Sequence, residues 1–100
     1  MKTILTTDTF NRWFKSIRDK ATKARLQVRI DRIEQGNYGD YKAVGSGVFE
    51  ARVAFGAGYR IYFIENGLEV VILLAGGDKS TQSKDIQTAV QIANDIRGTL

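Results

Sequence analysis

The sequence predicts a single α+β domain over residues 1–100, with its elements in the order β-α-α-β-β-β-α. Two observations predict this class. Apolar residues recur at helical spacing near both ends of the chain, and between them lie three segments of strand character separated by glycine turns. With 43% hydrophobic and 26% charged residues, the composition is typical of a folded globular protein.

The chain is expected to begin with a short strand over residues 2–6 and a helix starting near Thr9. Thr7 or Asp8 can cap this helix, because a short oxygen-bearing side chain accepts hydrogen bonds from the free amides of the first turn. Four apolar residues then follow at positions i, i+3, i+4 and i+7 and are assigned to the core: Phe10, Trp13, Phe14 and Ile17.

A second helix is expected from Asp19 to Gln35. No Gly or Pro interrupts the chain before Gly36, and a glycine commonly follows the last turn of a helix. Residues 26–30 (LQVRI) alternate between apolar and polar, which also fits a strand. Both interpretations stay open for this segment.

Three strands are expected next, over residues 49–55, 59–64 and 68–75, joined by hairpins at Gly56–Gly58 and at Asn66-Gly67. The third is almost continuously apolar, which indicates a central strand covered on both faces. Glycine-rich loops are expected on either side of this group, at residues 36–47 and 76–82. A last helix would be capped by Ser83, with Gly98 beyond its end.

The composition excludes several kinds of chemistry. The chain has no Cys and no His, which removes disulfides, thiolate metal sites, cysteine nucleophiles, the usual general base and most zinc sites. No metal or cofactor is expected. The start, MKTILTT, is too polar for a signal peptide, and the longest wholly apolar run is residues 70–75. We therefore expect a cytoplasmic protein that does not span a membrane.

Positive charge is concentrated in the first third of the chain. Residues 2–33 hold nine basic and three acidic residues, for a net charge of +6, whereas the remainder holds six basic and eight acidic residues. A basic region favours a polyanionic partner, and the candidates for RNA binding here are Lys15, Arg18, Lys23 and Arg25. A solvated helical face explains the charge equally well.

Motifs for nucleotide binding and for acid chemistry are incomplete. In Gly76-Gly77-Asp78-Lys79, an aspartate precedes the lysine where a phosphate-binding loop needs glycine. The two shorter glycine pairs, at 45–47 and 56–58, lack the third glycine of a dinucleotide fingerprint. Glu50 with Glu65 or Asp78 could form a carboxylate pair, but nothing in their spacing brings them together, so we interpret them as surface charges.

Three basic side chains and one tyrosine are better placed than these carboxylates to come together in the fold. Strand alternation places Arg52, Arg60 and Tyr62 on the sheet face opposite the apolar set, and Lys79 follows the end of the third strand. Arginine can hold a phosphate and stabilise its added charge in a transition state, and Tyr or Lys can transfer protons. These residues suffice for RNA cleavage by attack of the 2′-hydroxyl on its own phosphate. The alternative is a half-exposed sheet with scattered charges.

Several motifs are shared with one known family. They are Val48–Val53, Gly56–Phe63, Gly76–Gln82, Phe10 with Trp13, Ala24–Ile30 and Gly36–Asp40. Through them, over nearly its whole length, the chain resembles the addiction-module killer proteins, HigB-like toxins of the RelE/ParE superfamily. It departs from that pattern at Ala51, where leucine is usual, and at Ala57, where proline is usual.

The resemblance implies two N-terminal helices packed on a twisted antiparallel sheet, and a toxin that cuts mRNA on the ribosome without metal. Carried over by motif, Arg52 and Arg60 would bind the phosphate, Lys79 would transfer a proton or contact phosphate, and Tyr62 is a lesser candidate. Asp78 would shape the loop. The implied partners are mRNA, the ribosome and a cognate antitoxin of the helix-turn-helix type. ParE-like members of the superfamily inhibit DNA gyrase instead, and a non-catalytic protein that binds only antitoxin or nucleic acid is a third possibility.

Overall fold

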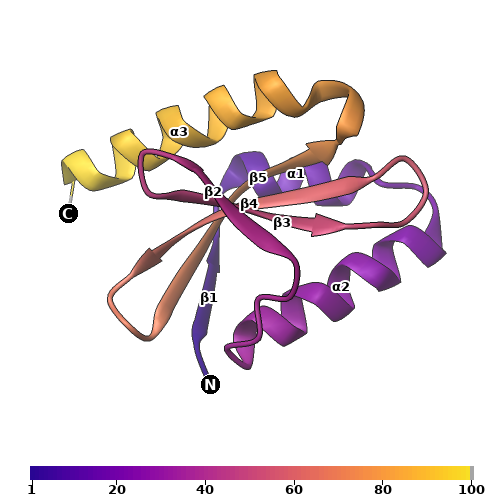
Figure 1. The fold of residues 1–100 in the computed structure, drawn as a ribbon, viewed down its shortest axis with the longest axis horizontal. Coiled ribbons are helices and arrows are strands. Elements are labelled where there is room, and N and C mark those ends of the chain that lie inside the picture. The colour runs from indigo at the N-terminus through magenta and orange to yellow at the C-terminus, as the bar shows by residue number, and fades with distance from the viewer. Residues whose placement is uncertain (100) are drawn as a thin grey trace.

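The computed structural model describes residues 1–99, which form five strands, three α-helices and a short 3₁₀ turn (Figure 1). No helix in this range is both long enough and apolar enough to cross a bilayer. In chain order the elements are β1 (Thr3–Thr6), α1 (Asp8–Ser16), α2 (Lys20–Glu34), β2 (Tyr41–Gly45), β3 (Val48–Val53), β4 (Tyr59–Asn66), β5 (Val70–Asp78), η1 (Lys79–Thr81) and α3 (Gln82–Thr99).

All five strands belong to one twisted sheet with the order β1-β5-β4-β3-β2. The strands from β2 to β5 pair antiparallel, whereas β1 pairs parallel to β5. Figure 1 shows α3 on one side of the sheet and α2 on the other. Helix α1 shares the side of α2, because Phe10 of α1 packs in the same apolar cluster as Leu26, Ile30 and Ile33 of α2.

The predicted α+β class is confirmed, but the predicted element order lacks one strand and the sheet is not wholly antiparallel. Residues Tyr41–Gly45, expected to be part of a loop, form the edge strand β2 beside β3. The tight turn between them has positive φ angles at Gly45, Ser46 and Gly47, which glycine adopts without strain. The sequence showed these turn glycines, but not the pairing partner that makes the preceding residues a strand.

The glycine pair Gly76-Gly77 was wrongly expected in a loop. Both residues belong to β5, which extends to Asp78. A side chain at Gly76 would overlap the indole of Trp13, and one at Gly77 would overlap the carboxylate of Asp85 in α3. The glycines therefore let α1 approach one face of β5 closely and the first turns of α3 approach the other.

Both N-terminal helices lie within about one residue of their predicted limits: α1, expected from near Thr9, begins at Asp8, and α2, expected over Asp19–Gln35, spans Lys20–Glu34. Thr7 caps α1 by accepting a hydrogen bond from the amide of Phe10 at 3.0 Å, and Asp19 caps α2 through the amide of Thr22 at 3.1 Å. Gly36 follows α2 with a φ of +88°. Residues 26–30 are therefore part of this helix and not a strand. Their apolar side chains Leu26 and Ile30 pack against the sheet.

The last helix differs from the prediction at both ends. A 3₁₀ turn precedes it, α3 itself begins at Gln82 instead of after Ser83, and it continues through Gly98. Ala89 and Ala93 are buried against strands β3, β4 and β5. The central strand β5 is covered by α1 on one face and α3 on the other, as its apolar run predicted.

Candidate functional site

Three of the four predicted catalytic residues lie on neighbouring strands at the α3 side of the sheet. Arg52 of β3 stands directly opposite Arg60 of β4, and Tyr62 stands opposite Glu50. The fourth, Lys79, begins the 3₁₀ turn that follows β5. Because β5 pairs with β4, this turn starts beside Tyr59, the neighbour of Arg60.

Arg60 and Lys79 converge on Gly58, at the end of the turn between β3 and β4. A Cβ atom at Gly58 would lie 3.6 Å from Cβ of Lys79 and 3.7 Å from Nη1 of Arg60. Nη1 of Arg60 also donates a hydrogen bond of 3.0 Å to the carbonyl of Gly58. These are ordinary contact distances, but the φ of +78° at this position is a backbone conformation that favours glycine over any larger residue.

Arg52 is held at the edge of the same cluster by Asp40. Its Nη2 lies 3.3 Å from Oδ1 of Asp40. The backbone amide of Arg52 also donates a hydrogen bond of 2.8 Å to the backbone carbonyl of Asp40. The side chains are 42% and 61% exposed. An exposed pair of this kind is weak, so Arg52 can exchange Asp40 for an incoming anion.

Glu50 contradicts the prediction of a surface carboxylate, because it is 0% exposed. Its Oε2 accepts hydrogen bonds from Tyr62 at 3.0 Å and from Gln82 at 2.8 Å, and lies 3.5 Å from Nε of Arg60. The Arg60 side chain is 11% exposed. A charged carboxylate is stable in the protein interior only with such partners. Glu50 thereby holds the guanidinium of Arg60 in place from the core side.

Tyr62 has no exposed surface. Burial, followed by the charge and the hydrogen bond of Glu50, raises the pKa of the Tyr62 phenol well above its usual value. The phenol is therefore a hydrogen-bond donor within the protein and remains protonated at neutral pH. In this structure its contribution to the site is to hold Glu50, and it does not reach a ligand directly.

Asp78 shapes the turn that carries Lys79, as the family resemblance implied. Its carboxylate accepts hydrogen bonds from the hydroxyl and from the amide of Ser80, the latter at 2.8 Å. These bonds, the hydroxyl first, lower the pKa of Asp78 below its usual value, and the charge of Arg60 acts in the same direction. The carboxylate is thus engaged in capping the 3₁₀ turn.

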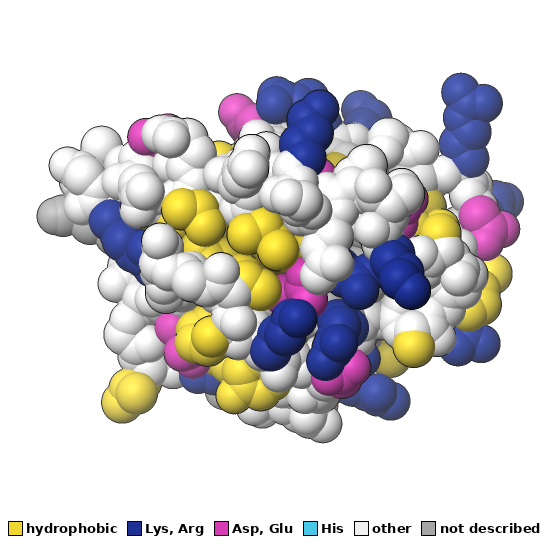
Figure 2. Space-filling model, turned by 45° about the horizontal axis from the view of Figure 1, so that its top comes forward, with side chains coloured by type: hydrophobic (Ala, Val, Ile, Leu, Met, Phe, Trp, Pro, Cys, Tyr) yellow, Lys and Arg dark blue, Asp and Glu magenta, His cyan; other side chains and the backbone are white. Residues whose placement is uncertain are grey.

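The surface over this cluster is suited to anions. Figure 2 faces the α3 side and shows Lys and Arg side chains gathered in its centre around acidic ones. Lys79 is exposed and takes part in neither ion pair found within residues 1–99. No group of three or more acidic, His or Cys side chains in that range is arranged to hold a metal ion. The arrangement can bind a phosphate and stabilise added negative charge on it.

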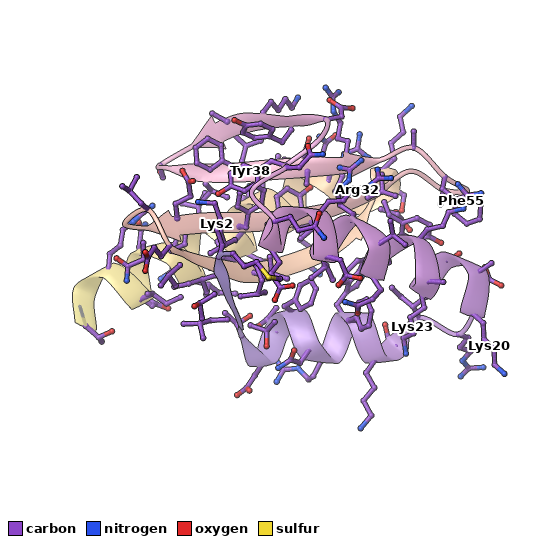
Figure 3. All side chains as sticks on the ribbon, turned by 90° about the horizontal axis from the view of Figure 1, so that it is seen from below. Lys2, Lys20, Lys23, Arg32, Tyr38 and Phe55 are labelled. Atoms are coloured by element: carbon purple, nitrogen blue, oxygen red, sulfur yellow. The ribbon has the colours of Figure 1, made fainter. Side chains whose placement is uncertain are left out.

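The four predicted RNA-binding residues do not form one group. Figure 3 shows Lys20 and Lys23 on one side of α2 and Arg32 and Phe55 on the other. Lys23 lies over the ring of Phe14 at 5.3 Å, whereas Arg25 lies over the ring of Phe55 at 4.3 Å. Lys15 and Arg18 belong to the end of α1 and the linker that follows it.

Four residues of functional interest were missed in the sequence. Glu50 and Gln82 support Arg60 from the core, and Arg29 and Arg32 join Arg25 along one side of α2. The spacing of the three arginines at i, i+4 and i+7 would have placed them on one helical face. No local signal could have shown that Glu50 is buried.

Comparison with known proteins agrees with the fold. No protein-family model matches the chain. It is 45% identical over 93 residues to an uncharacterized protein of Haemophilus influenzae, and the match covers 93% of this chain and 94% of the relative. The structure is similar to that of a free double arginine-to-alanine mutant of the Escherichia coli toxin RelE. That match has a TM-score of 0.63 and 12% sequence identity, and covers 86% of this chain and 95% of RelE. The chain therefore has a RelE-like toxin fold, and it belongs to the same family as the Haemophilus influenzae protein.

Proposed function

We propose that the protein is the toxin of a type II toxin–antitoxin pair, a HigB-like addiction-module killer protein that acts in the cytoplasm. Its activity is metal-independent cleavage of mRNA on the ribosome, which inhibits translation. The observation that carries this proposal is the convergence of Arg52, Arg60 and Lys79 at one end of a sheet with the RelE-like fold. The partners would be mRNA, the ribosome and a cognate antitoxin of the helix-turn-helix type.

The chemistry follows from the charge of the cluster. The RNA 2′-hydroxyl loses its proton to water and attacks the adjacent phosphorus, the bond to the 5′-oxygen breaks, and that oxygen takes up a proton. The products are a cyclic phosphate and a 5′-hydroxyl. Arg60, held by Glu50 and Gly58, would hold the phosphate, and Arg52 would leave Asp40 to stabilise the added charge.

Lys79 is placed to donate a proton to the leaving oxygen or to contact the phosphate, because it is exposed next to Arg60. Tyr62 would act through Glu50, as a positioning residue. We assign contacts with the rest of the RNA to Lys15, Arg18, Lys23 and Arg25, which lie in the basic first third of the chain.

Primer extension on a defined mRNA in a purified translation system, with and without ribosomes, tests the proposal. The wild type is expected to generate new 5′ ends only when ribosomes are present. Lys79→Ala should abolish them, because it removes an exposed group of the site while the fold stays intact. Arg12→Ala is the matched control: it removes one positive charge from the exposed side of α1 and should cleave like the wild type.

Intact mRNA with the wild type would contradict the endonuclease proposal. A gyrase supercoiling assay would then test the ParE-like alternative, since members of one fold can act on different targets. If Lys79→Ala cleaves as well as the wild type, the activity does not reside in this cluster.

A further inference from the structure

A groove lies between α2 and the end of β3, on the side of the molecule facing away from α3. Its volume is about 390 Å³. Three arginines form one wall, and small apolar groups and one aromatic ring form the rest. The lining residues are Arg25, Val28, Arg29, Arg32, Val53, Ala54 and Phe55.

The arginines of this groove are not held in ion pairs. Arg25, Arg29 and Arg32 succeed one another at i, i+4 and i+7, and none takes part in the ion pairs formed within residues 1–99. Asp31, their neighbour in α2, accepts a hydrogen bond from Gln27 instead. Like charges at this spacing destabilise a helix, so a face selected for stability alone would alternate in sign.

The guanidinium of Arg29 has a buried nitrogen without a hydrogen-bond partner. Its Nη1 is buried and has no hydrogen-bond partner, and its guanidinium packs against Gly39, where a Cβ would come within 3.1 Å of Cζ. Burial, followed by the charge of Arg32, lowers the pKa of Arg29, and Asp40 opposes that effect. An anion in the groove would give this guanidinium the acceptor that it lacks.

Arg25 and Phe55 make a cation–π contact within the lining of the groove. The guanidinium of Arg25 lies 4.3 Å from the centre of the Phe55 ring, and Arg25 is exposed. Guanidinium planes of this kind stack with unpaired bases in single-stranded RNA. The groove thus combines groups for phosphate with a surface for a base.

Two segments link the groove to the Arg52 cluster on the other face of the sheet: Asp40 and the turn after β3. Arg29 is close enough to Asp40 for that charge to affect its pKa, and Asp40 in turn pairs with Arg52. Phe55 begins the turn that leads to Gly58, on which Arg60 and Lys79 converge. An RNA strand that reached both regions would cross the edge of the sheet at Asp40 or at this turn.

We infer that this groove binds the phosphate backbone of single-stranded RNA, with Arg25, Arg29 and Arg32 as the phosphate contacts. The inference rests on the proposed function, because it extends the path of the same RNA beyond the cleavage cluster. It moves the expected RNA contacts from the side of α2 that carries Lys23 to the side that carries Arg32.

The test is the salt dependence of binding to a fluorescent oligouridine, measured by anisotropy without ribosomes. Each phosphate contact that is lost lowers the slope of log Kobs against log salt by about 0.7 for a single strand. Arg25→Gln with Arg32→Gln should therefore reduce the slope by about 1.4. Both residues are exposed, and circular dichroism checks that the double variant is folded.

Arg12→Gln with Lys20→Gln is the matched control, because it removes two exposed charges outside the groove and should leave the slope unchanged. Equal slopes for the groove variant and the wild type, or no RNA binding by the wild type at low salt, would overturn the inference. So would an unchanged RNA slope in a groove variant that loses binding to poly-glutamate, since that result indicates an acidic protein segment as the ligand. A reduced slope in a protein that fails to cut mRNA on ribosomes would support the groove and contradict only the endonuclease.

Discussion

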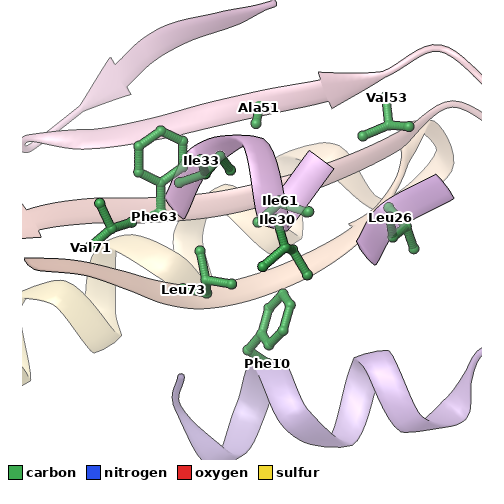
Figure 4. Packing of buried hydrophobic residues seen from close by; sticks show 10 residues of the cluster. All are labelled: Phe10, Leu26, Ile30, Ile33, Ala51, Val53, Ile61, Phe63, Val71 and Leu73. Atoms are coloured by element: carbon green, nitrogen blue, oxygen red, sulfur yellow. The ribbon is translucent and has the colours of Figure 1, made fainter. Parts of the chain in front are cut away.

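The two faces of the sheet are built differently. Figure 4 shows the face under α1 and α2, where Phe10, Leu26, Ile30 and Ile33 cover apolar strand residues in one continuous cluster. The face under α3 has its own apolar cluster, but at the end where the strands meet α3 it includes the charged pair of Glu50 and Arg60. The first face serves folding, and the second combines folding with support of the candidate site.

This difference has an energetic consequence. A buried ion pair is often no more stabilising than apolar residues of the same volume, whereas removing one partner is strongly destabilising. Glu50 is therefore better explained by its effect on Arg60 than by its contribution to stability. The contrast between the faces predicts the following changes, given in order of decreasing size.

On the apolar face, Phe63→Ala should have the largest effect on stability. Phe63 is fully buried, and truncating a buried Phe costs about 3–5 kcal/mol through lost transfer free energy and the cavity left behind. Urea denaturation would measure the change. Leu68→Ala is the control, since Leu68 is 88% exposed and should change the free energy of unfolding by less than about 0.5 kcal/mol.

On the α3 face, Glu50→Ala should cost about 3 kcal/mol, because it leaves Arg60 and Tyr62 without their buried acceptor. Glu65→Ala, which removes an exposed carboxylate bonded to Tyr38, should cost less than about 1 kcal/mol. Equal losses in the two variants would show that the α3 face does not depend on its buried pair. The double variant E50Q/R60Q should lose less than the sum of the single ones, since the two residues interact directly.

Gly76→Ala tests the close approach of α1 to β5. The new methyl group would overlap Trp13, and overpacking of this kind costs about 1–3 kcal/mol. Gly98→Ala is the opposite control, because nothing lies within 4 Å of a Cβ there and alanine stabilises a helix by about 0.5–1 kcal/mol relative to glycine. Thermal unfolding of the two variants should therefore shift in opposite directions.

The smallest effect concerns two tyrosines with raised pKa values, one on each face. Burial is the main cause for both, with Glu50 assisting at Tyr62 and Glu65 at Tyr38. A raised pKa in the folded state means that the stabilisation is complete below the ordinary value of 10.0 and is lost as pH rises through the folded value. Ultraviolet absorbance should show both phenols ionising later than free tyrosine.

Replacing either tyrosine by Phe separates the two faces. Tyr62→Phe removes one donor from the buried Glu50 and should cost about 1 kcal/mol. Tyr38→Phe removes a donor from the exposed Glu65 and should cost less. The reverse order would indicate that the Glu50 network is not important for stability.

The local features of the fold could be predicted from the amino-acid sequence. The capping residue Thr7 indicated where the first helix begins, and the glycine at position 36 indicated where the second one ends. Strand alternation assigned Arg52 and Arg60 to the same sheet face, and the register confirms it. These features could be predicted because each depends on residues within one helix, one strand or one turn.

Features that depend on residues far apart in the chain became visible only in the folded structure. Residues 41–45 become a strand because β3 lies beside them, and Gly76-Gly77 lies in a strand because α1 and α3 pack against it. Glu50 is buried by Gln82, a residue 32 positions away. Alternation assigned Glu50 to the correct face, but whether that face meets solvent or a helix depends on where α3 docks. Burial depends on how the helices and the sheet pack together, so a short sequence pattern cannot predict it.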